Sequence, residues 1–96
     1  MMGVELPASA LSVLQSLVAR GPMSPKDISR WSKVPIRTVN FAIKNLRRKG
    51  LVRRIPNLQD MRSPLYCTDL DAARNIVRTH GIDSIIGCQL TLILRR

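Results

Sequence analysis

The side chains best suited to chemistry lie along one face of a helix predicted for residues 36–49. At 100° per residue, the side opposite the apolar stripe carries three cations, an aromatic ring and two amides: Arg37, Lys44, Arg48, Phe41, Asn40 and Asn45. This face contains no acid, although an exposed helix normally mixes Glu with Lys. Guanidinium, ammonium and amide groups donate hydrogen bonds to phosphates and base edges. The pattern therefore predicts that this helix binds a polyanion.

The charge of the whole chain also favours a polyanionic partner. Sixteen Lys and Arg residues against six Asp and Glu give a net charge of +10 over 96 residues. Self-repulsion of this size weakens the compact state, so DNA, RNA or an anionic membrane surface is the expected partner. Between positions 26 and 62 only Asp27 and Asp60 oppose the cations, so the charge is local. Eleven of the sixteen basic residues lie in that stretch: Lys26, Arg30, Lys33, Arg37, Lys44, Arg47, Arg48, Lys49, Arg53, Arg54 and Arg62.

Other reactive groups are sparse. Cys67 and Cys88 match no metal or redox spacing, and we expect them to be small buried side chains of a reduced protein. His80, the single histidine, has no acid or cysteine cluster around it. No phosphate-binding glycine loop, activated nucleophile or carboxylate pair is present. The sequence therefore predicts no metal, no cofactor and no enzymatic activity.

Targeting signals are also missing from the sequence. The N-terminus lacks a basic stretch followed by an apolar one, so no signal peptide is expected. No apolar run reaches about 18 residues, which argues against a membrane span. We expect a cytoplasmic, nucleoid-associated protein.

The elements that must position the basic face are marked by Pro and Gly. A first helix is predicted over residues 7–19, and a second opens with Ser24 as N-cap and Pro25 behind it. Ile28 and Trp31 are expected to face inward. The basic helix follows Pro35, with its core stripe at Ile36, Val39, Ala42, Ile43 and Leu46.

After Gly50 the periodicity changes to that of strands. Residues 51–55 and 65–68 are predicted to pair around a turn-rich loop, residues 56–64. A helix over 69–80 follows, with its inward face at Leu70, Ala73, Ile76 and Val77. Residues 83–96 are compatible with a helix capped by Asp83 or with a strand, and their length favours the helix.

This order of elements resembles the winged helix-turn-helix family of DNA-binding regulators. The resemblance covers about residues 8–70 and is carried by residues 24–28, 37–46 and 50–54. It implies a mainly α fold with a small β-hairpin wing, no catalysis, and a recognition helix, about residues 36–49, in the major groove of double-stranded DNA. The side chains implied to contact DNA are Lys26, Arg30, Lys33, Arg37, Thr38, Asn40, Phe41, Lys44, Arg47, Arg48, Arg54 and Arg62.

The loop carries a finer resemblance. Residues 60–63 are similar to the wing of MarR-type regulators, in which an acid steadies an arginine that enters the minor groove. This implies that Asp60 holds Arg62 by a charge-assisted pair; alternatively, Asp60 simply makes a turn. MarR proteins are longer and enclose a ligand pocket, so no small-molecule effector is expected here.

Two apolar surfaces suggest a homodimer. The outer face of the first helix is uncharged, at Ser9, Ser12, Gln15 and Ser16. We expect residues 1–82 to form the DNA-binding domain and 83–96 a dimerisation helix with its interface at Ile85, Ile86, Leu90, Ile93 and Leu94. The alternative is that this segment folds back over its own chain.

Two other functions remain open. The domain could be a protein-interaction subunit of a transcription or replication complex, with only non-specific DNA binding. An RNA-binding winged helix is less favoured, because single-stranded RNA is normally held by stacking aromatics and Phe41 is nearly alone.

Overall fold

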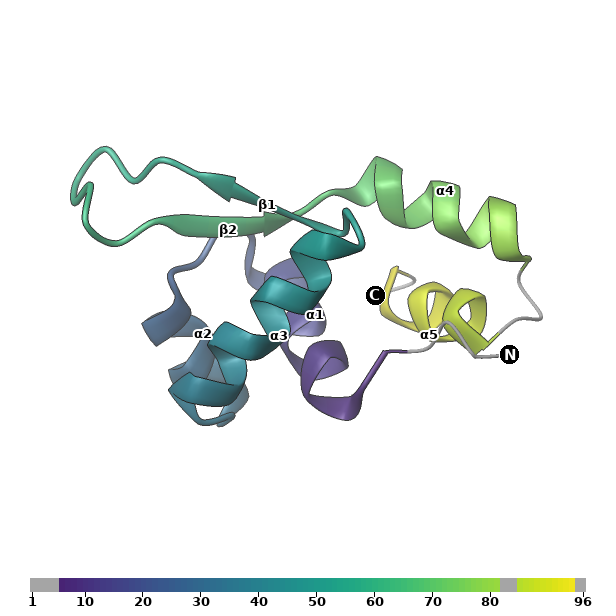
Figure 1. Ribbon diagram of the computed structural model, residues 1–96, viewed down its shortest axis with the longest axis horizontal. Coiled ribbons are helices and arrows are strands. Elements are labelled where there is room, and N and C mark those ends of the chain that lie inside the picture. Colours follow the sequence, from purple (N-terminus) through teal and green to yellow (C-terminus); the bar gives the residue numbers. More distant parts are fainter. Residues whose placement is uncertain (1–5, 82–84, 95–96) are drawn as a thin grey trace.

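The computed structural model describes residues 6–81 and 85–94, which form five helices and one two-stranded hairpin. Figure 1 shows the first three helices in the middle of the molecule, the hairpin extending to one side and the last two helices on the other. This arrangement confirms the predicted winged helix-turn-helix fold with an additional C-terminal helix. The elements are α1 (Ala8–Arg20), α2 (Pro25–Ser32), α3 (Ile36–Arg48), β1 (Val52–Ile55), β2 (Leu65–Thr68), α4 (Leu70–His80) and α5 (Ile85–Leu94).

The helix boundaries follow the local signals in the sequence. The Ser24 hydroxyl accepts a hydrogen bond from the Asp27 amide at 3.2 Å and so caps α2, with Pro25 in its first turn. Gly50 follows α3 with a φ of 78°, a left-handed conformation that glycine adopts without a Cβ penalty. Asp83, the predicted cap of the last helix, lies outside the described residues.

The hairpin is tied to the helices at its base. Strands β1 and β2 are antiparallel, with Val52 opposite Thr68 and Ile55 opposite Leu65. Met23, in the extended piece before α2, exchanges two backbone hydrogen bonds with Tyr66, at 3.0 and 2.8 Å. These bonds hold the hairpin in a fixed orientation relative to α2 and α3.

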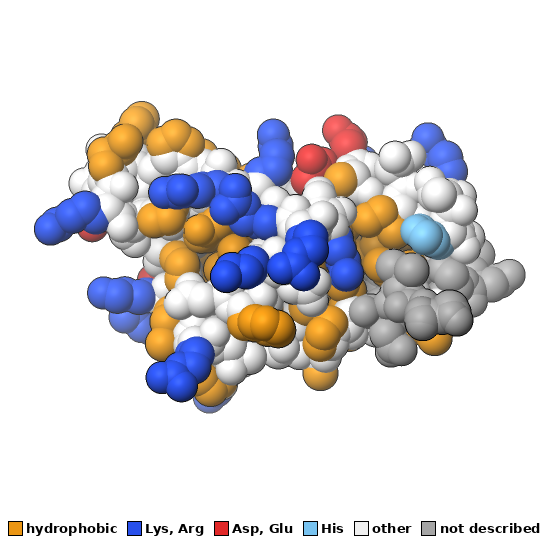
Figure 2. All heavy atoms as spheres, in the orientation of Figure 1, with side chains coloured by type: hydrophobic (Ala, Val, Ile, Leu, Met, Phe, Trp, Pro, Cys, Tyr) orange, Lys and Arg blue, Asp and Glu red, His pale blue; other side chains and the backbone are white. Residues whose placement is uncertain are grey.

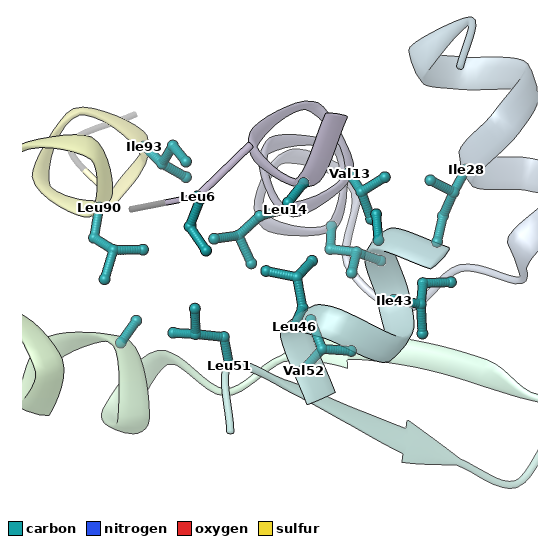
Figure 3. Packing of buried hydrophobic residues seen from close by; sticks show 14 of the residues in the cluster. Leu6, Val13, Leu14, Ile28, Ile43, Leu46, Leu51, Val52, Leu90 and Ile93 are labelled. Atoms are coloured by element: carbon teal, nitrogen blue, oxygen red, sulfur yellow. The ribbon is translucent and has the colours of Figure 1, made fainter. Parts of the chain in front are cut away.

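One hydrophobic core joins the helices to the base of the hairpin. Figure 3 shows Leu14 of α1 and Leu46 of α3 pointing toward one another, with Leu51 and Leu90 closing the same interior. All four side chains are at most 1% exposed. The predicted core stripe of α3 is confirmed at Val39, Ala42, Ile43 and Leu46.

The C-terminal segment is a helix, and it belongs to this core. Helix α5 packs against α1 and α4, and Ile86, Leu90 and Ile93 are at most 7% exposed. Two hydrogen bonds between the Gln89 amide and the backbone of Leu6, at 3.0 and 3.2 Å, hold α5 to the segment before α1.

The predicted dimer interface is therefore corrected. Ile86, Leu90 and Ile93 fill the interior of their own chain, where α5 packs against α1 and α4, so they do not form a surface. Leu94 is partly buried against the same core. Ile85, at 56% exposure, is the predicted interface residue that stays on the surface.

Three other residues predicted to face inward are exposed. Trp31 is 50% exposed, and the Arg20 guanidinium lies 4.2 Å from the centre of its ring, a cation–π contact. Ile36 and Leu70 are 44% and 42% exposed. Each of these two is the first residue of its helix, where the first turn extends beyond the core.

Small side chains show errors in both directions. Cys88 is exposed and Cys67 is half-buried, so the expectation of two buried thiols is wrong. Ser16, predicted on the outer face of the first helix, is buried. Its hydroxyl donates to the Ser12 carbonyl at 2.9 Å, so a small polar group is buried with its hydrogen bond made.

Candidate nucleic-acid interface

Helix α3 is positioned by the turn that precedes it. The Ser29 hydroxyl donates to the Val34 carbonyl at 2.6 Å, and the Ser32 hydroxyl accepts from the Val34 amide at 3.3 Å. Lys33 takes a left-handed conformation with a φ of 62° at the end of α2. Pro35 then starts α3 at a fixed angle to α2, which is the geometry of a helix-turn-helix.

The face of α3 opposite the core is exposed and free of acids. Arg37, Asn40, Phe41, Lys44 and Arg48 recur at helical spacing and are all exposed, with Phe41 at 69%. Figure 2 shows Lys and Arg side chains in a band across the face that α3 and the hairpin share, with hydrophobic side chains between them. Thr38, also predicted to contact DNA, is half-buried beside this face.

Basic residues of α2 and of the turn flank this face. Lys26, Arg30 and Lys33 are exposed. The Arg30 guanidinium lies 4.0 Å from the Asp27 carboxylate, but both side chains are more than half exposed. A pair of this kind is weak, so Arg30 can exchange Asp27 for another anion.

The end of α3 and strand β1 extend the basic surface toward the hairpin. Arg47 and Arg54 are exposed there. Arg53 differs, because its Nε lies 3.8 Å from the carboxylate of Asp69, the residue that also caps α4.

In the hairpin loop, Asp60 makes two contacts with Arg62. Its carboxylate accepts the Arg62 amide hydrogen bond at 3.1 Å, which builds a turn. The same oxygen lies 3.6 Å from the Arg62 Nε. Arg62 itself is 95% exposed, so its guanidinium points into solvent at the end of the hairpin.

Sequence reasoning missed the apolar character of this loop. Leu58 and Met61 are 88% and 68% exposed, among the most exposed large hydrophobic side chains described. The signal that could have found them is their position beside Asn57 and Asp60, which favour turns and so force the next side chain outward.

The parts of the chain that the structure describes contain no group of three or more His, Cys, Asp or Glu residues close enough to hold a metal ion. No helix among these residues has both the length and the apolar character needed to cross a membrane.

Known proteins share this architecture. The family model described as "Sugar-specific transcriptional regulator TrmB" matches residues 3–68, more than half of the chain. Comparison with curated protein sequences gives no significant match.

Solved structures of similar fold include MarR-type regulators. YusO from Bacillus subtilis is 19% identical with a TM-score of 0.68, over 94% of this chain and 56% of its own. The multiple antibiotic resistance repressor MarR is 23% identical with a TM-score of 0.67, over 95% and 64%. FabT from Streptococcus pneumoniae, solved in complex with DNA, is 24% identical with a TM-score of 0.64, over 78% and 52%.

The chain thus spans between 52% and 64% of the length of these solved proteins, and at these identities they show the fold alone. The family model that matches this chain is that of a transcription regulator. The chain belongs to the TrmB family of transcription regulators and has the winged helix-turn-helix fold.

Proposed function

We propose that this protein is a sequence-specific regulator of transcription that binds double-stranded DNA as a homodimer. The observation that carries the proposal is the exposed, acid-free face of α3, in which cations, an amide and an aromatic ring alternate at helical spacing. An amide and an aromatic ring carry no charge and so cannot neutralise phosphates, whereas both can contact base edges. This composition favours base reading over purely electrostatic attraction.

In the proposed complex, α3 lies in the major groove and the wing, about residues 56–64, follows the minor groove. Arg37 and Lys44 pair with guanine, Asn40 with adenine, and the Phe41 ring contacts a thymine methyl. Thr38 lies at the edge of the same groove. The groups assigned to phosphates are Lys26, Arg30, Lys33, Arg47, Arg48 and Arg54.

The proposed wing contact centres on Arg62. Its guanidinium is almost fully exposed, and the rigid turn made by Asp60 fixes its backbone. A narrow A·T-rich minor groove has an enhanced negative potential that attracts such an arginine. The regulator then acts by occupying its site, without a small-molecule effector, as a nucleoid-associated protein of the cytoplasm.

The homodimer is proposed on the exposed face of α5. Ile85, Cys88 and Leu92 recur at helical spacing on the side opposite the buried residues of this helix, and all three are exposed. Helix α5 also carries no charge, so two copies of a chain with a net charge of +10 can approach there with least repulsion. A two-fold axis would place the two recognition helices about 34 Å apart, in successive major grooves.

Selection from a pool of mixed-sequence duplexes at rising salt tests this function. Retained DNA enriched in a palindromic motif that survives higher salt is the expected result. On that motif, Arg37→Ala and Lys44→Ala should each weaken binding about fivefold or more, because a base contact is worth about 1–3 kcal/mol. Arg78→Ala is the matched control, since it removes an exposed arginine from α4. Unchanged affinity in both α3 variants would refute the proposal.

A docking module is the second candidate, favoured by the exposure of Ile85 and Leu92 at 56% and 64%. Such a module would retain DNA without enriching any motif, and binding would collapse steeply with salt, as phosphate neutralisation requires. It would also form a stable complex with a different protein, which Leu92→Ser would abolish. Enrichment of a palindrome excludes this reading as the main function.

A further inference from the structure

The hairpin loop is built from two consecutive turns of the same design. Asn57 begins the first: its side-chain oxygen accepts the Gln59 amide at 3.1 Å and its carbonyl accepts the Asp60 amide at 3.1 Å. Asp60 begins the second and accepts the Arg62 and Ser63 amides in the same way, at 3.1 and 3.0 Å. The loop backbone is therefore fixed by its own hydrogen bonds.

A further bond closes the two turns into one unit. The Asn57 side-chain amide donates to the Ser63 carbonyl at 3.0 Å and so joins the two ends of the loop. Pro56 and Pro64 flank the unit, and each has a φ restricted by its ring. The loop thus needs little further ordering when it meets a partner.

In each of the two turns, the first central residue of the turn is apolar. Leu58 and Met61 directly follow the residues that begin the turns, and they are 88% and 68% exposed. Met61 borders a hollow of the hairpin with Arg54 and Pro56, and Leu58 is almost fully exposed, so neither side chain lies in the core. Figure 2 shows hydrophobic side chains covering the outer end of the hairpin, with a basic side chain beside them.

The second central residue of each turn is polar. The charge around Leu58 and Met61 is positive. Gln59 and Arg62 follow Leu58 and Met61, and Arg54 borders the same hollow as Met61. The acid in the loop, Asp60, is already engaged by Arg62. A matching partner must therefore offer apolar surface directly beside strong negative charge, as the faces of unstacked bases do between two phosphate backbones.

We propose that Leu58 and Met61 form an apolar wedge that enters the minor groove, partly unstacks one base step and kinks the duplex. This inference rests on the proposed DNA binding and adds a deformation to it. Leu and Met are among the side chains that architectural proteins insert in this way. The rigid double turn supplies the stiffness that a wedge needs, and Arg62 anchors it in the same minor groove. The wedge should favour flexible pyrimidine–purine steps, which are kinked at low cost.

The test measures the bend directly. Energy transfer between dyes at the two ends of a duplex carrying the selected motif reports the end-to-end distance on binding. The wild type should shorten it by a kink of about 20° or more. The double variant Leu58→Ser, Met61→Ser should bend the duplex less than about half as much, because serine keeps the two turns but removes the apolar side chains. Gln59→Ser, in the same turn, is the matched control and should bend DNA as the wild type does.

Sequence dependence gives a second readout. A duplex with a TpA step under the wing should bind the wild type about fivefold more tightly than one with a stiff ApA step, and the double variant should lose that preference. Binding without bending, or equal bending by the double variant, would overturn the wedge while leaving the proposed function intact. Absence of any DNA binding would instead refute the proposed function. Equal affinity of wild type and double variant on both steps would assign Leu58 and Met61 to a protein partner.

Discussion

Asp60 makes two interactions that substitution can separate. Its Oδ1 accepts the Arg62 amide hydrogen bond at 3.1 Å and lies 3.6 Å from the Arg62 Nε. Asp60→Asn keeps a side-chain carbonyl for the turn and removes the charge of the ion pair. Asp60→Ala removes both. Comparing the two variants isolates the turn, because each lacks the same negative charge.

The magnitudes follow from exposure. Arg62 and Asp60 are 95% and 50% exposed, so their ion pair contributes at most about 1 kcal/mol. Removing the carboxylate also reduces repulsion from phosphates, which acts in the opposite direction. We therefore expect Asp60→Asn to bind DNA within about twofold of the wild type. The turn hydrogen bond is worth about 1 kcal/mol, and a wing without it must be ordered on binding, so Asp60→Ala should bind about fivefold more weakly than Asp60→Asn.

Fluorescence anisotropy on one duplex, at three salt concentrations, measures these affinities. The difference between Asp60→Ala and Asp60→Asn should be nearly independent of salt, because the two variants carry the same charge. If Asp60→Asn were as damaging as Asp60→Ala, the ion pair would be the decisive interaction and this reasoning would be refuted. If both variants matched the wild type, the wing would not touch DNA.

Three stability predictions follow from burial, each measured by urea denaturation. Thr68→Val should stabilise the protein by about 1 kcal/mol, because the Thr68 hydroxyl is buried without a hydrogen-bond partner; a loss of stability would contradict this. Leu90→Ala should destabilise it by about 2–5 kcal/mol, because Leu90 is fully buried in the core, whereas Leu92→Ala, at an exposed position of the same helix, should cost less than about 0.5 kcal/mol; equal effects would show that α5 does not pack as described. Ser24→Ala should cost about 1 kcal/mol through loss of the hydrogen bond to the Asp27 amide, and Ser24→Gly should recover part of this if capping is the cause.

The sequence alone was sufficient for the elements up to residue 80 and for the basic face. Ser24 with Pro25, and Gly50 after the basic helix, act through neighbouring backbone atoms, so their effect needs no tertiary information. The exposed face of α3 was equally accessible, because a period of 3.6 residues decides which side chains share a side. Arg37 and Lys44 lie where this period places them.

Burial at the edges of helices was decided by the tertiary structure. Trp31 and Ile36 have inward positions by periodicity, yet each lies at or next to one end of its helix, beyond the part that neighbouring elements cover. The size of a core depends on which helices meet, and periodicity within one helix contains no information about its neighbours. The same holds for Cys88, which is exposed on a helix that is otherwise apolar.

Helix α5 shows the difference most clearly. The composition of α5 correctly indicated that its apolar side chains must be buried. It did not indicate whether they are buried against their own chain or against a second chain. The structure assigns Ile86, Leu90 and Ile93 to the chain's own core and leaves Ile85 and Leu92 outside. Hydrophobic burial is non-directional, so a sequence specifies that apolar area leaves water. The three-dimensional arrangement of α1 and α4 determines which surface it meets.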